Sequence, residues 1–401
     1  MAIAIDDVVG RETRHVLQTY RRQPVTLVRG QGVRLWDSEG REYLDLLSGI
    51  GVAALGHSHA GLARAIADQA TTLLHTSNLF YHPLQGQLAE QLAALSGLPR
   101  AFFCNSGAEA VEACLKFARR YWYTRKEPRA EFIALDGSFH GRTFGALSVT
   151  SDEHYRAPFE PLLPTVTFVP VNDAVALAAA VSNRTAAIIA EPVQGEGGIR
   201  PLTPAFAAAI SAACEKTGAL FIADEVQSGL GRTGHPFYFQ ALGLKPHLVS
   251  VGKALGGGVP IGAALVSQDV ADTLSFGDHG STYGGNLLAC RAALCVVHEL
   301  VGGGLITQIN RVGRHFEQTL KAVTARHTFV KEVRGSGLMW GLELDRDAGP
   351  IVPAGLVQGV IVNRTANTVV RLLPPLVITE AEADEALGRL DAALGAVGAA
   401  A

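Results

Sequence analysis

Short, continuously apolar segments recur between residues 100 and 270, and they constrain the possible folds more than any other feature. They lack the alternating pattern of half-exposed strands and are typical of strands buried on both faces of a sheet. Helical patterns separate them, as in 107–123, where apolar residues recur every three or four positions. This order predicts an α/β fold whose mainly parallel sheet is covered by helices on both faces. The predicted strands are 101–104, 132–135, 166–169, 186–190, 219–224, 247–251 and 261–266.

The two ends of the chain follow other patterns. Segment 33–46 predicts a short strand pair that turns at Ser38-Glu39-Gly40. After about residue 305, a long amphipathic helix, strand-like segments and a last helix over about 379–394 predict a smaller α+β unit. We expect the two ends to form one small domain, with its N-terminal part at 1–59, a large domain at 60–305 and its C-terminal part at 306–401.

Composition excludes several classes of protein. Apolar residues make up 48% of the chain and charged residues 18%, which excludes a disordered chain. The 34 basic and 37 acidic residues nearly balance, so we expect neither a nucleic-acid nor a membrane partner. The N-terminus lacks the pattern of a signal peptide, and no apolar run approaches the ~18 residues of a membrane span, so a cytoplasmic location is expected. Five cysteines without a C-x-x-C pair predict free thiols rather than disulfides or a zinc site.

A lysine follows one of the predicted strands. Lys253 comes after the strand 247–251 and before a glycine-rich turn, in the stretch SVGKALGGGVPIGA (250–263). An amine at the end of a buried strand loses solvation unless a bound group uses it. A Schiff base with a carbonyl group, of a substrate or of pyridoxal phosphate, is a use that fits. A surface lysine beside a flexible loop is the alternative.

Ligands of open α/β sheets bind beyond the carboxyl ends of the strands, and a phosphate site is predicted there. Ser106 and Glu109 fit a capping box at the start of helix 107–123. The amides of Gly107 and Ala108 would then be free to bind a phosphate group. An ordinary capped helix is the alternative.

The segment DGSFHGRTF (136–144) follows the second predicted strand and offers two ligand contacts. Phe139 could stack on a flat ring, and Arg142 could bind a carboxylate at two points. The alternatives are a core phenylalanine, a place for which Phe144 competes, and a surface ion pair. Strand 186–190 is followed by Glu191 and Glu196, and either could be a solvated side chain. The glycine loop around Glu196 makes it the better candidate for a ligand contact.

Asp224 ends another buried strand, where an unpaired carboxylate would be costly. Opposite a pyridinium nitrogen the carboxylate would be paired, and it would keep that nitrogen protonated. Val226 would lie beneath the ring, and Gln227 could reach the ring hydroxyl. The alternative for Asp224 is a helix or turn cap.

Two hydroxyl residues, Ser281 and Thr282, stand beside glycines in STYGGN (281–286). They could complete the phosphate site, or cap the helix that begins at Asn286. Phosphate-binding patterns of other classes do not fit: no G-x-G-x-x-G follows a strand, and Ala254 stands where a P-loop needs Ser or Thr. A dinucleotide-dependent oxidoreductase is therefore disfavoured, and so is a non-catalytic binding protein, because the chain keeps both Lys253 and Asp224.

Together these segments resemble one family, the class III (subgroup II) aminotransferases with the type I pyridoxal phosphate fold. The resemblance implies pyridoxal 5'-phosphate as cofactor, no metal, and a homodimer with active sites at the subunit interface. It also implies a large domain with a mainly parallel sheet and a smaller α+β domain built from both chain ends. The matching segments are NSGAEA, FHGRTFGALSVT, EPVQGEGG, DEVQSGLGRTG, SVGKALGGGVPIGA, STYGGN and RLLPPLVIT.

The resemblance also implies a role for each candidate residue. Lys253 would be the Schiff-base lysine and proton shuttle, and Asp224 the partner of the pyridine nitrogen. The implied cofactor contacts are Ser106, Gly107, Ala108, Phe139, Val226, Gln227 and, from the other subunit, Thr282. The implied substrate contacts are Arg142, Glu196, Ser281 and Arg371.

The resemblance implies a reaction with two substrates in one pocket. Arg371 resembles the arginine that pairs with Glu196 in one half-reaction and is released to bind 2-oxoglutarate in the other. Members that act on N-acetylornithine are the most similar. The expected reaction moves the terminal amino group of N2-acetyl-L-ornithine to 2-oxoglutarate, giving N-acetyl-L-glutamate 5-semialdehyde and L-glutamate, a step of arginine biosynthesis.

The identity of the amino donor is the least constrained part of this expectation. Ornithine aminotransferases usually have a tyrosine where Ile50 stands, and its absence favours an acylated donor. Transaminases of succinylornithine, succinyl-diaminopimelate, ornithine or 4-aminobutyrate are the alternatives. The family also includes an aminomutase and a decarboxylase. Glu196 and Arg371 together favour a two-substrate transaminase, because a mutase needs no site for 2-oxoglutarate.

Overall fold

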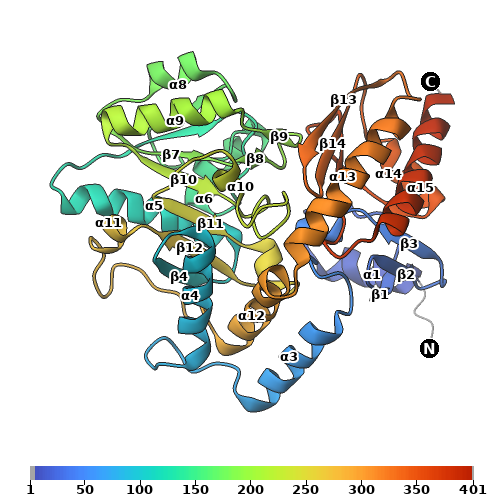
Figure 1. Ribbon diagram of the computed structural model, residues 1–401, viewed down its shortest axis with the longest axis horizontal. Coiled ribbons are helices and arrows are strands. Elements are labelled where there is room, and N and C mark those ends of the chain that lie inside the picture. The colour runs from blue at the N-terminus through green and yellow to red at the C-terminus, as the bar shows by residue number, and fades with distance from the viewer. Residues whose placement is uncertain (1–4, 400–401) are drawn as a thin grey trace.

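A seven-stranded sheet forms the centre of the computed structural model, which describes residues 5–399 (Figure 1). Six of its strands run in one direction, and β12 runs antiparallel to both of its neighbours, β11 and β4. The predicted mainly parallel sheet is thus confirmed, with one reversed strand. In spatial order the strands are β4 (Arg100–Cys104), β12 (Gly262–Val266), β11 (Leu248–Val251), β10 (Leu220–Asp224), β7 (Thr185–Ala190), β5 (Glu131–Leu135) and β6 (Val166–Val169).

The reversal of β12 follows from its short connection to β11. Parallel neighbours need a crossover of a dozen or more residues, whereas antiparallel neighbours can be joined directly. Only the segment 252–261, which contains the short 3₁₀ helix η2 (Lys253–Gly256), separates β11 from β12. The chain therefore turns back at Lys253 without a covering helix.

Helices bury both faces of this sheet. Successive strand residues belong to different apolar clusters: Ile188 and Phe221 lie in one, and their neighbours Ile189 and Ile222 lie in the other. The helix α5 (Gly107–Thr124) contributes to the second cluster, and α9 (Pro204–Thr217) contributes to the first. This arrangement explains why the strand sequences are continuously apolar.

The two ends of the chain meet beside the large sheet (Figure 1). A four-stranded sheet consists of β1 (Leu27–Gln31), β2 (Arg34–Asp37) and β3 (Glu42–Asp45), followed by β15 (Val360–Ile361), which pairs parallel with β3. A second sheet has the order β13 (Val330–Ser336), β14 (Met339–Leu344), β17 (Val369–Leu372) and β16 (Asn363–Thr365). The boundaries expected near residues 60 and 305 stay a prediction.

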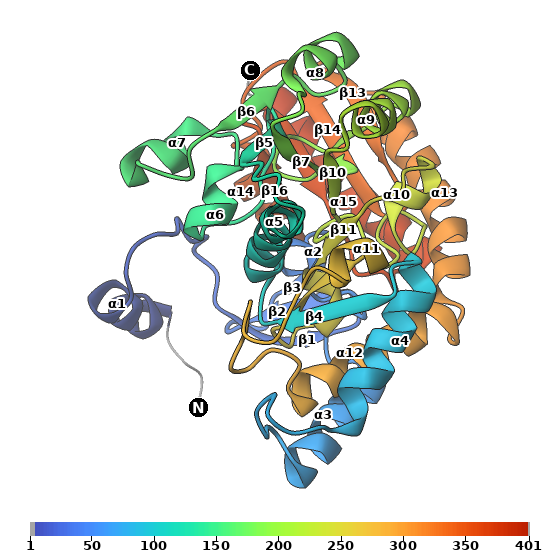
Figure 2. The same cartoon turned by 90° about the vertical axis from the view of Figure 1, so that its left-hand side faces the viewer.

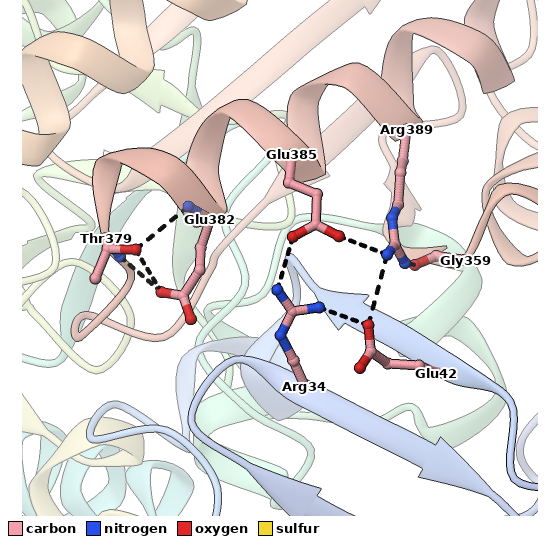
Figure 3. A network of polar contacts seen from close by, with 7 residues as sticks. All are labelled: Arg34, Glu42, Gly359, Thr379, Glu382, Glu385 and Arg389. Carbon is pink, nitrogen blue, oxygen red and sulfur yellow. Dashed lines mark hydrogen bonds and ion pairs between the residues drawn. The ribbon is translucent and has the colours of Figure 1, made fainter.

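Ion pairs connect the last helix, α15 (Glu380–Ala399), to the N-terminal strands (Figure 3). Arg34 contacts both Glu42, at 2.5 Å, and Glu385, at 2.6 Å. Arg389 contacts the same two carboxylates, at 3.5 and 2.6 Å. Single surface pairs contribute only about 0–1 kcal/mol, so this network chiefly fixes the position of α15 relative to β2 and β3.

The start of α15 is set by a capping box, also visible in Figure 3. Thr379 Oγ1 accepts a hydrogen bond from the amide of Glu382 at 3.3 Å, and the Glu382 carboxylate accepts one from the amide of Thr379 at 2.9 Å. The helix extends to Ala399, beyond the end that we predicted near residue 394.

No helix was predicted before residue 60, but the structure has α1 (Ile5–His15) and the short α2 (Ser48–Gly51) there. The helix α1 stands apart from the rest of the molecule (Figure 2).

Among residues 5–399, no single helix is long and apolar enough to cross a membrane. Only the bent pair of α12 (Leu287–Val301) and α13 (Leu305–Thr324) meets those criteria jointly. The remaining elements are α3 (Ala60–Thr72), α4 (Pro83–Ser96), α6 (Phe144–Ser148), α7 (Glu153–Arg156), η1 (Ala157–Phe159), α8 (Ala174–Ala180), β8 (Val193–Gln194), β9 (Arg200–Pro201), α10 (Tyr238–Ala241), α11 (Gln268–Ala271) and α14 (Ile351–Gln358).

Candidate active site

The candidate site lies where several strands of the large sheet end. Asp224 is the last residue of β10, and Lys253 follows β11 by two positions. The loops after β5 and β7 carry Phe139 and Glu191, and α5 begins just after β4. Because these five strands share one direction, their carboxyl ends meet at one edge of the sheet, where ligands of such folds bind.

The Asp224 carboxylate is buried and bound by three donors. Its Oδ1 accepts hydrogen bonds from Ser250 Oγ at 2.9 Å and from the amide of Val226 at 3.1 Å. Its Oδ2 lies 2.6 Å from His140 Nδ1. The bond to Val226 is the turn cap that we named as the alternative. A carboxylate offers about four acceptor positions, so one position stays open for a further donor such as a protonated ring nitrogen.

Sequence reasoning missed His140. Its imidazole is buried against Asp224, its amide donates to Thr150 Oγ1 at 2.9 Å, and its Nε2 has no partner among residues 5–399. Asp224 is 84 positions away in the chain, so no local pattern indicates the pair. The only indication in the sequence was that His140 directly follows Phe139, a predicted site residue.

Lys253 is half-buried and adopts a φ of 42°, in the left-handed region. A side chain there carries backbone strain, a feature that clusters at functional sites. Burial, and then the charge of Arg371, lowers the pKa of the Lys253 amine, while the carboxylates of Glu196 and Asp224 act in the opposite direction. This environment favours a neutral, nucleophilic amine and differs from that of a solvated surface lysine.

The N-terminus of α5 lies directly against the lysine segment. A Cβ atom on Gly252 would come within 3.1 Å of Gly107 Cα, and one on Gly107 would come within 2.6 Å of Val226 Cγ1. Val226 therefore packs between the end of β10 and the phosphate site predicted at Gly107 and Ala108. Because the first helical hydrogen bond runs from the amide of Ala110 to Ser106 O, the amides of Gly107 and Ala108 precede it.

The predicted capping box at this helix is only half right. Ser106 Oγ accepts the amide of Glu109 at 3.2 Å, as predicted. The Glu109 carboxylate, however, binds the amide of Asn105 at 2.5 Å instead of that of Ser106. It also accepts from Asn105 Nδ2 at 3.3 Å, so Asn105 offers this carboxylate two donors where Ser106 would offer one backbone donor.

The loop after β5 presents Phe139 and Arg142. Phe139 is half-buried, whereas Phe144 is 67% exposed and is therefore not the core residue of this loop. The Arg142 guanidinium lies 3.4 Å from the ring centre of Tyr155 and 5.5 Å from that of Phe139. Within the described chain Arg142 has no carboxylate partner, so the surface ion pair is not observed and the guanidinium can bind an anion.

Glu196 and Arg371, predicted as substrate contacts, form an ion pair. Arg371, on β17, is buried, and its Nη1 lies 2.5 Å from Glu196 Oε1 and 3.2 Å from Gln227 Oε1. The Thr365 hydroxyl donates to the carbonyl oxygen of Glu196. Burial alone would raise the pKa of Glu196, but the charge and hydrogen bond of Arg371 outweigh it and lower the pKa. The pair is therefore charged at neutral pH.

A cavity of about 420 Å³ gives access to this ion pair. Its wall contains Phe139, Tyr155, Glu196, Thr365 and Arg364, together with neighbouring loop residues. The cavity is large enough for an amino acid with a short acyl group.

Ser281 and Thr282 do not cap the following helix. Asn286 caps α12 itself, since its Oδ1 accepts the amide of Ala289 at 2.9 Å. Ser281 Oγ accepts from Asn105 Nδ2 at 3.2 Å, which links it to the segment before α5. Thr282 is exposed and lines a separate cavity, so its expected contact with a cofactor of the other subunit stays a prediction.

These residues fit pyridoxal 5'-phosphate. The open acceptor position of Asp224, the amine of Lys253, the ring of Phe139 and the first amides of α5 match the nitrogen, the carbonyl, the face and the phosphate of that cofactor. The absence of a Cβ atom at Gly107 leaves the closely packed contact with Val226 intact.

Comparisons with known proteins agree with this geometry. The family described as "Aminotransferase class-III" matches residues 17–394. An "Acetylornithine aminotransferase" from Caldanaerobacter subterraneus subsp. tengcongensis is 44% identical over 388 residues, which is 96% of this chain and 98% of that protein. Among solved structures, the ornithine aminotransferase from Toxoplasma gondii ME49 has a TM-score of 0.95 at 33% identity and covers 100% of this chain and 97% of its own. The N-acetylornithine aminotransferase from Stenotrophomonas maltophilia K279a has a TM-score of 0.84 at 35% identity and covers 98% and 100%.

Proposed function

The chain belongs to the class-III aminotransferases, a family of pyridoxal-phosphate enzymes with the type I fold, and from this premise we propose its substrates and residue roles. It transfers the terminal amino group of N2-acetyl-L-ornithine to 2-oxoglutarate, giving N-acetyl-L-glutamate 5-semialdehyde and L-glutamate. The observation that carries this proposal is similarity over nearly the whole chain, at 44 and 45% identity, to enzymes named acetylornithine aminotransferase. The ion pair of Glu196 and Arg371 beside Lys253 supports it.

The residues at the strand ends hold pyridoxal 5'-phosphate in this proposal. When bound, the cofactor supplies an electron sink that stabilises a carbanion on the substrate. Asp224 keeps the ring nitrogen protonated through its open acceptor position, and His140 and Ser250 hold the carboxylate in place. Phe139 and Val226 would hold the ring between them. The helix start at Ser106, Gly107 and Ala108 binds the phosphate, Gln227 lies near the ring hydroxyl, and Thr282 of the partner subunit completes the phosphate site.

Lys253 performs the proton transfer. Burial and the charge of Arg371 lower the pKa of this amine, so Nζ gives up its proton more readily than a solvated lysine does. It would hold the cofactor as the Schiff-base lysine and accept a proton from the substrate carbon. The neighbouring Glu196 and Asp224 carboxylates keep the pKa from falling further, so that the protonated amine can return the proton in the same cycle.

The pair of Glu196 and Arg371 lets one pocket serve two substrates. While the amino donor is bound, Glu196 neutralises the buried Arg371, and the pocket accepts a chain without a second carboxylate. When 2-oxoglutarate binds, its carboxylate replaces that of Glu196 on the guanidinium. The side chain of Glu196 is 33% exposed, so it can turn toward solvent, whereas Arg371, 1% exposed, stays in place.

The donor end of the pocket recognises an acylated amino acid. Arg142, free of a carboxylate partner in the described chain and stacked on Tyr155, binds the α-carboxylate of the donor. Ser281 is a further proposed substrate contact. Ile50 offers no hydrogen-bond partner to a free α-amino group, and it lies in α2, which packs against the 3₁₀ helix of Lys253. An acylated nitrogen is therefore preferred over the charged amine of ornithine.

The proposed enzyme is a cytoplasmic homodimer. Large apolar side chains are exposed in two neighbouring segments, Leu79 to Tyr81 and Tyr283, close to Thr282. Asn78 joins the segments by donating to the carbonyl oxygens of Ser281 and Gly284, at 3.2 and 2.9 Å. Such a patch is typical of a surface that a second copy covers. Sedimentation equilibrium tests this part: a monomer at micromolar concentration would contradict it.

The donor preference is tested by the rate of glutamate release from 2-oxoglutarate. The purified enzyme receives N-acetylornithine, N-succinylornithine, ornithine or 4-aminobutyrate as donor, each over a range of concentrations. We expect the highest kcat/KM for N-acetylornithine. A higher kcat/KM for ornithine or 4-aminobutyrate would keep the reaction type and refute the proposed donor.

A further inference from the structure

We infer that Glu191 is a positioning residue whose carboxylate holds Phe139 and the Glu196 loop in fixed positions relative to each other. The inference rests on the proposed function, in which Phe139 contacts the cofactor and Glu196 controls Arg371. It goes beyond the roles assigned above, because Glu191 acts through its neighbours.

The geometry around Glu191 carries the inference. Its side chain is buried, and each oxygen serves a different loop. Oε1 accepts a hydrogen bond from the amide of Phe139 at 3.0 Å, in the loop after β5. Oε2 accepts one from the amide of Gly195 at 2.9 Å, in the loop that carries Glu196. One carboxylate thus connects two loops that have no sequence proximity.

The packing at Gly195 transmits any displacement of this loop. A Cβ atom on Gly195 would come within 2.4 Å of Gln227 Oε1, so the loop backbone lies directly against that side chain. Gln227 Oε1 in turn accepts a hydrogen bond from Arg371 at 3.2 Å. A shift of Gly195 would therefore disturb Glu196 and Gln227, two of the three side chains that bind Arg371.

The ionisation of Glu191 decides whether it can hold both loops. A carboxylate accepts strongly from both amides, whereas the O–H oxygen of a protonated carboxyl is a weaker acceptor for one of them. Burial raises the pKa of Glu191 to about 7, with the charge of His140 lowering it and that of Asp224 raising it. The amine of Lys253 is the third charged group that interacts with it. We therefore expect the carboxylate to hold both loops more firmly above about pH 7 than below it.

The test compares Glu191→Gln with Glu225→Gln. Glutamine has the same size, but its NH₂ group faces one of the two amides and cannot accept from it. Glu225 is a matched control: it is also buried, its pKa is also raised by burial to about 7, and it accepts from the amide of Phe239 at 2.7 Å and from Ser228 Oγ at 2.5 Å. It has no hydrogen bond to Phe139 or Gly195.

The first readout is hydrogen–deuterium exchange of the cofactor-free protein in peptides covering 137–142 and 193–198. We expect E191Q to speed exchange about tenfold in one or both peptides, the effect of losing about 1.4 kcal/mol of local stability, and E225Q to leave both unchanged. In the unmodified protein, protection of the same peptides, corrected for intrinsic rates, should rise as the pH increases through about 7. This titration keeps the test decisive if E191Q fails to fold.

The second readout is the affinity for pyridoxal 5'-phosphate between pH 6 and 8. We expect affinity to rise with pH in the unmodified protein and in E225Q, and to be about tenfold weaker and flat with pH in E191Q. Wild-type exchange in E191Q, or an unchanged pH profile, would overturn the inference. Absence of transamination in the unmodified protein would instead refute the proposed function, so the two failures are distinguishable.

Discussion

Replacing Glu196 by glutamine should strengthen the binding of 2-oxoglutarate while it slightly weakens the folded state. Glutamine keeps the size of the side chain and an oxygen that Arg371 can still bind, but it removes the charge. Hydrogen bonds to charged groups contribute about 1.5–3 kcal/mol and neutral ones about 0.5–1.5 kcal/mol. Because one-third of the Glu196 side chain is exposed, the loss should lie near the low end, about 1 kcal/mol.

The same free energy should reappear in substrate affinity. A carboxylate of 2-oxoglutarate must displace the carboxylate of Glu196 from Arg371, and a neutral competitor is displaced more easily. A gain of about 1 kcal/mol corresponds to a KM for 2-oxoglutarate that is about fivefold lower. Initial rates at saturating donor and varied 2-oxoglutarate measure this constant, and urea unfolding measures the loss of stability.

Glu131→Gln provides the matched control for this prediction. Glu131 pairs with Arg184 at 2.6 Å and its side chain is 24% exposed, but it lies at the start of β5, at the opposite end of that strand from the site. We expect a stability loss no larger than that of E196Q and no change in KM. An unchanged or higher KM for 2-oxoglutarate in E196Q, or an equal decrease in E131Q, would refute the exchange of carboxylates on Arg371.

Three further predictions concern Lys253, Arg371 and Arg142. Lys253→Ala should abolish turnover and leave the far-ultraviolet circular dichroism spectrum unchanged. The fold should persist because this amine makes no hydrogen bond among residues 5–399. Measurable turnover would contradict the proposed role of Lys253. Arg371→Gln removes a charge that lowers the pKa of Lys253, so the amine should lose its proton at higher pH. The pH dependence of Lys253 acetylation in the cofactor-free protein measures this pKa. A pKa equal to or lower than that of the unmodified protein would show that the charge of Arg371 does not act on Lys253. Arg142→Ala should raise the KM for the amino donor more than about tenfold. It should cost little stability, because the side chain is exposed. An unchanged KM, determined by steady-state kinetics, would show that Arg142 does not bind the donor.

The strands of the large sheet could be predicted because each is buried on both faces. A continuous apolar segment leaves few other interpretations, and the seven predicted segments lie within one residue of the observed strands at every end. The direction of β12 could not be predicted in this way. The direction depends on the short connection through Lys253. The apolar pattern of the strand itself does not indicate a direction.

The candidate site was predictable to the extent that its groups stand at strand ends. Asp224 ends a buried strand, and Lys253, Phe139 and Glu196 lie in the loops after such strands, so the direction of the sheet brings them together. What the sequence did not reveal were the contacts between distant loops, above all His140 on Asp224.

The sequence also did not reveal side-chain exposure or hydrogen bonds to the backbone. The pattern of the loop after β5 did not distinguish a half-buried Phe139 from an exposed Phe144. It also did not show that the Glu191 carboxylate binds two loops, because it binds their backbone amides. Every residue except proline has such an amide, so the sequence does not indicate which amides bind. Side-chain identity predicts the chemistry available at a position, whereas partners across loops depend on the folded backbone.

The central claim is that Lys253 and its neighbours carry out both half-reactions with N-acetylornithine and 2-oxoglutarate. The most direct test is the visible absorption spectrum of the purified holoenzyme, recorded in a stopped-flow instrument after addition of one substrate at a time. We expect N-acetylornithine alone to bleach the band of the bound cofactor, and 2-oxoglutarate to restore it. A band that only free ornithine or 4-aminobutyrate bleaches would contradict the donor, and a protein that shows no such band with added pyridoxal 5'-phosphate would contradict the role of Lys253.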